Sequence, residues 1–484
     1  HCRPDGTEVE LSGMACDCDV VIVGGGIGGL TAGLYLARAK QRVLICEQRA
    51  DPGGFLTATP GPAGRLDVRL PCICSQGVVF PVLAELGLAG GRLLRPADWQ
   101  LAAPGFQLKF EHLTQVVQGL QVVFPQEAAA LEEYGKLLHG AINWLKELFL
   151  PHPFLHTPVL WTELVSKVLR KPALAAKMTG LLSTATARFL QRRFSDPDLL
   201  RLLGSLGYPR MPALLHAGMW YLFLEDYWLP EGGLYGFTQA FTRSFLAAGG
   251  TLLVNSEVDK ILVRQNRAYG VELAGGRLIT AKHVISAADF NTTYQSLLRD
   301  AALPAVFHRR LRSRRPSASY VTVCLMTSMP ERLLQKLNTL HTFWFPAAHL
   351  PQGMIISAPA GRSGSAGQPL YLSCQYNAQE SPAILQTRLL RAAEDLLPGL
   401  QQCISYAELW SPARYAREFG AFGGASAGWD LHPFHIVTRG FPGWNSPVRN
   451  LYHASQWVYS PGGVPAAMLS ARQVSRKILG LSNI

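Results

Sequence analysis

The chain has 484 residues, of which 16% are charged and 48% hydrophobic, and its formal net charge is +12 at pH 7. This length is more than one core needs, so we expect two or three domains that bury much apolar surface or expose some to an apolar partner. No uninterrupted apolar run reaches about 18 residues, so we predict no membrane-spanning helix.

The basic residues gather in two places, residues 188–193 and 308–315. No RNA- or DNA-binding motif accompanies them, so we expect no nucleic acid partner. An anionic membrane surface is the better functional interpretation. A solvated arginine face explains these clusters equally well.

The first chemical signal along the chain lies in residues 19–54. Residues 20–23 predict a strand, residues 24–29 (GGGIGG) a glycine turn, residues 30–39 a helix, and residues 42–46 a second strand that ends at Glu47. This order of strand, glycine turn, helix, strand and acid is typical of a dinucleotide-binding βαβ unit.

Each glycine of such a unit, and its acid, has a physical task. Gly24 allows a tight turn, Gly26 leaves room for a pyrophosphate, and Gly29 allows the helix to pack closely on the strand. The pyrophosphate is expected at the helix N-terminus, and Glu47 is placed to accept hydrogen bonds from a ribose. The following Gly53-Gly54 pair resembles the extended fingerprint of FAD enzymes, although an ordinary turn is the alternative.

The predicted secondary structure changes character twice along the rest of the chain. Residues 81–228 show few strand signals and predict a helical insertion, with helices at 81–88 and 125–150. Residues 229–289 predict a helix at 236–248 and strands at 251–254, 258–264, 268–273, 278–280 and 283–287. Residues 291–440 predict strands at 319–327, 370–377 and 404–410 and a helix at 383–397.

Four blocks, in this order, resemble the phytoene desaturase-like flavoproteins, a superfamily of carotenoid desaturases, carotenoid isomerases and retinol saturases. They are the fingerprint at 19–54, PEGG at 230–233, the block at 258–289 that ends VISAAD, and NLYHASQW at 450–457 followed by PGGVP at 461–465. The resemblance implies an α/β fold with a discontinuous, Rossmann-like FAD-binding domain of the glutathione-reductase type. It further implies a mixed α+β substrate domain that carries the helical insertion.

The resemblance also implies domain limits and site residues. The FAD-binding domain takes residues 19–80, 229–290 and 441–484, the helical insertion takes 81–228, and the substrate-domain sheet takes 291–440. Apart from the resemblance, we expect residues 1–18 to form a disordered arm. A C-terminal helix at 465–479 points its N-terminus at the flavin. The implied FAD contacts are Gly24, Gly26, Ile27, Gly28, Gly29, Glu47, Gln48, Gly53, Gly54, Val258, Ala288, Gln456, Gly463, Val464 and Pro465.

Three departures from the family pattern stand out. Ser455-Gln456 replaces a common Gly-Asp, Phe55 replaces the usual arginine after the second glycine pair, and a Phe-Asp-x-Gly-Pro motif is reduced to LDVRLP at 66–71. They leave the substrate and the direction of reaction open. They do not remove FAD.

The implied chemistry is hydride transfer between an apolar polyene or isoprenoid and the flavin. No catalytic base is identified. His453 is a candidate, although such a histidine is more often packed. The histidine pairs 152/156 and 432/435 have prolines between them, so we predict no metal.

Two alternatives of the same fold stay open: a carotenoid isomerase or polyene saturase that works from reduced FAD, and a flavin-binding scaffold without turnover. An amine oxidase is disfavoured by the PGGVP block. Nine scattered cysteines and no visible secretory signal favour a reducing compartment. We expect a cytoplasmic or plastid-side protein with peripheral membrane contact, and the oligomeric state is not predicted.

Overall fold

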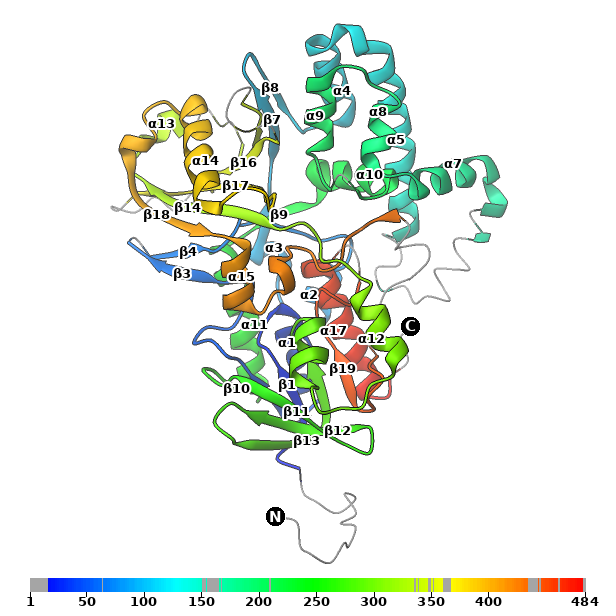
Figure 1. Ribbon diagram of the computed structural model, residues 1–484, viewed down its shortest axis with the longest axis vertical. Coiled ribbons are helices and arrows are strands. Elements are labelled where there is room, and N and C mark those ends of the chain that lie inside the picture. The colour runs from blue at the N-terminus through cyan, green and yellow to red at the C-terminus, as the bar shows by residue number, and fades with distance from the viewer. Residues whose placement is uncertain are drawn as a thin grey trace, which may run out of the picture.

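The computed structural model has a lower region and a broader upper region, joined by several crossings of the chain (Figure 1). The lower region holds both α1 and α17, which come from opposite ends of the chain. The structure describes residues 16–62, 64–149, 154, 165–166, 168–208, 210–334, 337, 339–346, 350, 352–359, 367–433, 443, 445–459 and 462–481. Most of the predicted N-terminal arm therefore lies outside the described residues, and β1 begins at Cys18.

The lower region is built on a seven-stranded sheet, called here the first sheet. Its order is β10-β2-β1-β13-β12-β11, with β19 paired to β13. The strands β10, β2, β1, β13 and β19 run parallel, and β11 and β12 are antiparallel additions. The bounds are β1 (Cys18–Val23), β2 (Val43–Cys46), β10 (Thr251–Leu253), β11 (Val258–Arg264), β12 (Arg267–Leu273), β13 (Leu278–Ser286) and β19 (Leu451–His453).

The strand β13 corrects one prediction, because the strands expected at 278–280 and 283–287 are a single strand. Its first residues pair with β12, and its later residues lie between β1 and β19. Ala281 is buried between exposed or half-buried neighbours, so the alternation continues where the sequence pattern looked interrupted. The three separate stretches of the predicted FAD-binding domain each contribute strands to this sheet.

Three helices cover the first sheet: α1 (Ile27–Arg38), α11 (Gly233–Ala247) and α17 (Val464–Ile478). Both α11 and α17 pack on α1. Close approach depends on small residues, since a Cβ added at Gly33 would lie 2.9 Å from Ile45 and 3.1 Å from the Phe245 ring. The helix α2 (Val79–Glu85) packs on α17.

The upper region contains a second seven-stranded sheet of order β18-β14-β17-β16-β15-β7-β8. One face is covered by α14 (Pro382–Leu396) and by α13 (Glu331–Leu334), with Val323 and Leu372 among the buried contacts. The strands are β7 (Trp99–Ala103), β8 (Phe106–Lys109), β14 (Tyr320–Thr327), β15 (His341–Trp344), β16 (Met354–Ser357), β17 (Gln368–Gln375) and β18 (Ile404–Trp410).

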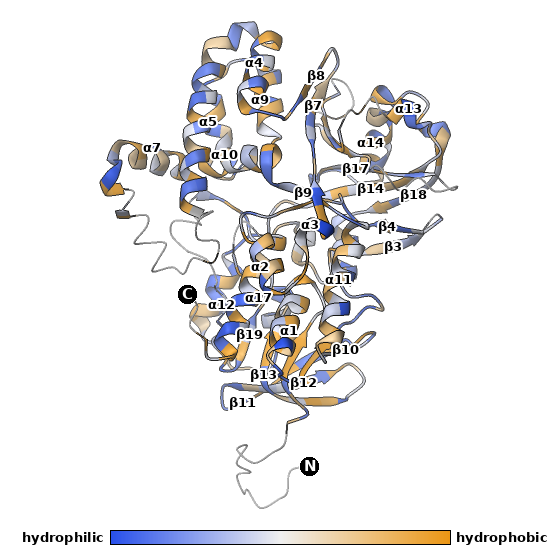
Figure 2. Ribbon diagram, turned by 180° about the vertical axis from the view of Figure 1, so that it is seen from behind, coloured by the Kyte–Doolittle hydropathy of each residue, from blue (hydrophilic) through white to orange (hydrophobic). Residues whose placement is uncertain are grey.

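A group of helices packs on the face of this sheet opposite to α14, at the end formed by β7 and β15. Figure 2 shows hydrophilic and hydrophobic residues alternating along α4, α5 and α9, as expected for helices with one buried face. The bounds are α4 (Leu113–Val123), η2 (Pro125–Glu127), α5 (Ala128–Phe149), α7 (Pro172–Ser183), α8 (Thr186–Gln191), α9 (Pro197–Gly204), α10 (Ala213–Tyr221) and η3 (Leu222–Asp226). The short helix α3 (Gly90–Leu93) lies apart from this group and contacts α2.

The prediction of a purely helical segment at 81–228 is wrong in one respect. This segment also forms β6 (Leu94–Pro96), β7 and β8, and β7 pairs with β15 from the other half of the substrate domain. All three strands are short, and β7 finds its partner β15 more than 200 residues away, so local periodicity carries little signal for them. The exact domain limits stay a prediction.

Two small sheets lie between the regions. One pairs β3 (Ala58–Gly61) with β4 (Gly64–Asp67), and the other has the order β5-β9-β6, with β5 (Ile73–Cys74) and β9 (Tyr227–Pro230). Within the described part of the chain, no helix has the length and apolar character needed to cross a bilayer.

Candidate functional site

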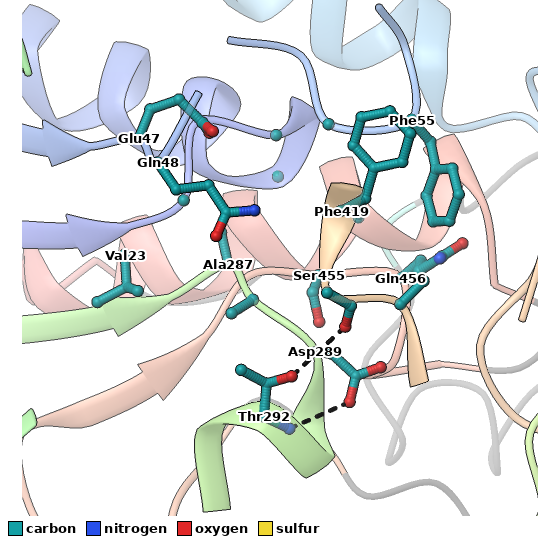
Figure 3. Close-up of a pocket in the computed structure, with 18 of the residues that line it drawn as sticks. Val23, Glu47, Gln48, Phe55, Ala287, Asp289, Thr292, Phe419, Ser455 and Gln456 are labelled. Atoms are coloured by element: carbon teal, nitrogen blue, oxygen red, sulfur yellow. Dashed lines mark hydrogen bonds between the residues drawn. The ribbon is translucent and has the colours of Figure 1, made fainter. Parts of the chain in front are cut away.

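A cavity of about 400 Å³ lies where β1, β2 and β13 end. Its size is that of an ordinary ligand pocket. Figure 3 shows side chains from the first sheet, the C-terminal turn and the upper region around it. Most of the predicted cofactor residues line it, namely Gly24, Gly26, Ile27, Gly28, Glu47, Gln48, Gly53, Gly54, Val258, Ala288, Gln456, Gly463 and Val464.

Two predicted residues have a different position. Gly29 does not line the cavity: a Cβ there would lie 2.1 Å from the Gly24 carbonyl oxygen, so this glycine permits the contact between helix and turn. Pro465 also lies off the cavity wall, buried in the first turn of α17. Its ring presets the backbone at a position where the missing N–H costs nothing.

The first glycine turn is shaped by close backbone approaches. Gly24 has φ +95°, a conformation that favours glycine. A Cβ on Gly28 would lie 2.0 Å from the Ala454 carbonyl oxygen, so Gly28 lets the C-terminal turn pass over the start of α1. A Cβ on Gly26 would meet no atom within 4 Å, which leaves open space on the cavity side of the turn.

The second glycine pair meets the first turn directly. Gly53 donates its N–H to the Gly25 carbonyl at 2.8 Å and forms an isolated β-bridge with Gly26. Gly53 has φ +132° and Gly54 has φ +57°, so both use the freedom of glycine. The two glycine motifs therefore form one continuous piece of the wall.

Glu47 lies at the end of β2 and is buried. Its carboxylate accepts hydrogen bonds from the Gly25 N–H at 2.7 Å and the Arg49 N–H at 2.9 Å. Burial raises the pKa of Glu47, and these hydrogen bonds oppose that shift. Each carboxylate oxygen keeps a further lone pair for a ligand hydroxyl. Gln48 bonds the Glu418 carbonyl at 3.3 Å and links the turn to the upper region.

The departure at Gln456 has a clear structural role. Its Oε1 accepts a hydrogen bond from the Gly463 N–H at 3.2 Å, which closes the turn before α17. Gly463 has φ +90°, so this turn also depends on glycine. The helix α17 starts at Val464, beside the cavity, and has no acidic residue in its first turn.

Sequence reasoning missed several residues of the wall, and Asp289 is one of them. Its carboxylate accepts hydrogen bonds from the N–H groups of Asn291 at 2.6 Å, Thr292 at 3.3 Å (Figure 3) and Phe422 at 3.2 Å. Burial raises its pKa to about 6. It thus connects the first sheet to a loop of the upper region. The spacing of residues in the sequence does not predict this contact.

An aromatic group closes the cavity toward the upper region. The Phe55 ring lies 5.3 Å from the ring of Phe419, at the end of α15 (Pro412–Phe419). Arg49 stands 4.9 Å from the Phe419 ring and forms a 2.6 Å ion pair with Glu418. The arginine expected at position 55 is therefore replaced by a hydrophobic contact.

His453 lies away from the cavity wall. It is fully buried, stacks on Phe290 at 4.2 Å, and shares a 2.7 Å hydrogen bond with the Tyr294 hydroxyl. Burial lowers its pKa to about 3, so it is neutral. This placement fits a packing residue better than a catalytic one.

The residues present fit a dinucleotide that ends in a flavin. The N-termini of α1 and α17 both face the cavity, and neither first turn holds an acid that would compete with a phosphate or a reduced ring. The open space at Gly26 and the carboxylate of Glu47 suit a pyrophosphate and a ribose respectively.

The described residues hold no group of three or more histidine, cysteine or acidic side chains suited to a metal ion. His152, His156 and His435 lie outside the described residues. The described cysteines are free thiols.

Comparison with known proteins places this geometry in a family. Residues 27–479 match the family described as flavin containing amine oxidoreductase. The chain is 26% identical to hydroxyneurosporene desaturase of Rubrivivax gelatinosus, over 95% of this chain and 93% of that one. It is 25% identical to 4,4'-diapolycopene oxygenase of Methylomonas sp, over 95% and 98%. Identity to all-trans-retinol 13,14-reductase of Rattus norvegicus is 26%, over 66% and 56%.

Solved structures show the same fold. An oxidoreductase from Methanosarcina mazei superposes with a TM-score of 0.64 at 16% identity, over 94% of this chain and 99% of that one. Cyclohexylamine oxidase from Brevibacterium oxydans gives 0.64 at 17% identity, over 96% and 99%. The predicted fold class and the resemblance to phytoene desaturase-like proteins are confirmed. The chain belongs to the flavin containing amine oxidoreductase family and is a flavin-dependent oxidoreductase of the carotenoid desaturase type.

Proposed function

We propose that the chain binds FAD and transfers hydride between an apolar isoprenoid of carotenoid type and the flavin. The observation that carries this proposal is the meeting of both glycine motifs and the C-terminal turn on one cavity. The names of the relatives, a hydroxyneurosporene desaturase and a diapolycopene oxygenase, support a polyene substrate.

The roles of the chain's residues follow from their positions. The N-terminus of α1 and the open space at Gly26 would hold the pyrophosphate, and Glu47 would accept the ribose hydroxyls. The positive end of α17 would stabilise negative charge on the flavin ring. Phe55 and Phe419 would keep water from the reacting carbon. Bound FAD supplies the hydride acceptor or donor.

A polyene saturase that works from reduced flavin is the second candidate. The retinol 13,14-reductase relatives favour it, because the reaction in their name is a reduction. The scaffold alternative has no such support, since Gln456 keeps the C-terminal turn closed.

The experiment is expression in cells that accumulate phytoene or a poly-cis carotene, followed by product mass and absorption spectrum. Desaturation lowers the product mass by two hydrogens per step and extends the chromophore, whereas saturation raises the mass and shortens it. Isomerisation shifts the spectrum at constant mass. No change with any polyene, from a protein that carries FAD, would contradict the proposed substrate class.

We also propose a peripheral contact with an anionic membrane at α12 (Ala305–Arg312). Arg309, Arg310 and Arg312 are exposed there, and Val306 is 52% exposed beside them. Such a surface combines charge attraction with an apolar contact. Cosedimentation with phosphatidylcholine vesicles should require added phosphatidylglycerol and should fall when the three arginines become glutamine. Equal sedimentation of that variant would leave the cluster as a solvated face.

A further inference from the structure

The two faces of the second sheet differ in chemistry. Side chains alternate along each strand, so Val321, Val323 and Leu325 of β14 face α14. The intervening residues face the other way, and the register aligns Tyr320 with Gln375 and Thr322 with Ser373. The hydroxyls of Thr322 and Ser373 lie 3.0 Å apart. The same face also carries Cys324 and Tyr371, which pack against Val68.

This face lies against residues 67–70, the segment that leads from the lower region into the upper region. The Asp67 N–H donates to the Tyr371 hydroxyl at 3.2 Å, and the Tyr415 hydroxyl donates to the Val68 carbonyl at 2.7 Å. These bonds fix the backbone immediately before Arg69. The segment belongs to LDVRLP at 66–71, which stands where the family commonly has a Phe-Asp-x-Gly-Pro motif.

Arg69 is half-buried and lines the cavity. Its guanidinium lies 5.7 Å from the Phe55 ring, and among the described residues no carboxylate pairs with it. The other arginines of the wall differ, since Arg49 pairs with Glu418 and Arg299 with Asp259. A partly buried, unpaired guanidinium is costly unless a ligand compensates it.

Two buried tyrosines feel the charge of Arg69 but do not line the cavity. Burial raises the pKa of Tyr208 and of Tyr320, and the positive charge of Arg69 opposes both shifts. Both hydroxyls are therefore protonated at neutral pH, and each has a side-chain partner. Tyr208 is 3.4 Å from the Ser426 hydroxyl, and Tyr320 is 3.4 Å from the Gln375 amide.

We propose that Arg69 binds a carboxylate on an otherwise apolar substrate, at the point where the cavity meets the second sheet. The inference rests on the proposed function, whose substrate class it narrows. The planar guanidinium matches a carboxylate through two parallel hydrogen bonds. An alcohol would leave the charge uncompensated, and an amine would be repelled.

The test compares two probes with the same polyene chain, all-trans-retinoate and all-trans-retinol, on the FAD-loaded protein. Dissociation constants come from quenching of tryptophan fluorescence, which needs no turnover. We expect the acid to bind at least about tenfold more tightly, the usual size of a charge-assisted contact. Arg69→Gln should abolish this preference, and Arg69→Lys should keep part of it.

Arg65→Gln is the matched control, because Arg65 lies on the neighbouring strand β4 and pairs with Asp51 at 2.8 Å. It should leave the preference unchanged. Equal binding of both probes to the unchanged protein would overturn the inference. So would an Arg69→Gln variant that keeps the preference but loses FAD or shifts the flavin potential, since Arg69 would then serve the flavin. Turnover of a hydrocarbon polyene without acid preference would overturn this inference alone and leave the proposed function standing.

Discussion

The lower and upper regions line the cavity with different groups, the first with backbone and the second with side chains. The first sheet contributes mainly backbone, through glycines such as Gly26, Gly28 and Gly53, whereas the upper region contributes side chains such as Phe419. A backbone wall tolerates added atoms only where open space remains, as at Gly26, but a side-chain wall can change its chemistry without a change of fold. We therefore expect substitutions in the lower region to affect folding and cofactor binding, and those in the upper region to affect substrate choice.

The largest effect is expected at Gly28. Gly28→Ala places a Cβ 2.0 Å from the Ala454 carbonyl oxygen, and backbone on both sides prevents relief. We expect a loss of about 3 kcal/mol of unfolding free energy, the upper end for overpacking, and loss of bound flavin. Chemical denaturation measures this. Gly180→Ala on α7 is the control, because an added Cβ there meets no atom within 4 Å. Wild-type stability for Gly28→Ala would refute the close approach.

Acidification should destabilise both regions. Burial lowers the pKa of His341 and of His453 to about 3, and that of His216 to about 4. Below pH 6.5 these histidines bind protons in the unfolded chain but stay neutral in the folded chain. The free energy of unfolding therefore falls as the pH drops from about 6.5 toward 4. Each histidine contributes up to about 1.4 kcal/mol per pH unit. Asp289, with its pKa raised to about 6, acts in the opposite direction between about pH 4 and 6.

Two of these histidines, one in each region, sharpen the comparison at pH 7. His341 stacks on Trp99 at 4.4 Å and neither ring nitrogen has a described partner, whereas His453 bonds Tyr294. His453→Phe should cost about 1 kcal/mol, and His341→Phe should be neutral or stabilising. Thermal unfolding of both variants at pH 7 and pH 5 decides this. Both should show a shallower acid response, and an unchanged response in either would contradict its neutral, buried state.

A small effect on stability, and none on flavin content, is expected where the regions touch. Tyr371→Phe removes the acceptor of the Asp67 N–H at 3.2 Å and should cost about 0.5–1.5 kcal/mol. Flavin content should stay at the wild-type level, because Tyr371 does not line the cavity. Loss of flavin would mean that the second sheet sets the shape of the nucleotide site.

Much of the first sheet was predictable because its signals are local. The strand, glycine turn and acid of residues 19–54 follow one another directly, and the strands predicted at 251–254, 258–264 and 268–273 are observed within one residue at each end. The C-terminal turn was predictable only through the family resemblance. Nothing in its own residues says that Gln456 closes the turn onto Gly463.

The missed features depend on contacts between distant segments. Asp289 meets Phe422, and β7 meets β15, only after the chain has folded. Arg69 was visible as a departure from a motif, yet its lack of a described partner depends on which side chains surround it. Spacing alone carries no information on such surroundings.

The central claim is that the glycine turns and the C-terminal turn together hold one FAD. The most direct test is the flavin content of Gly26→Leu, since the backbone at residue 26 has φ −67° and its Cβ would meet only open space. The variant should fold like the FAD-free wild type and release no FAD on denaturation, whereas the wild type releases one FAD per chain. A folded Gly26→Leu protein that still carries a full complement of FAD would contradict the account.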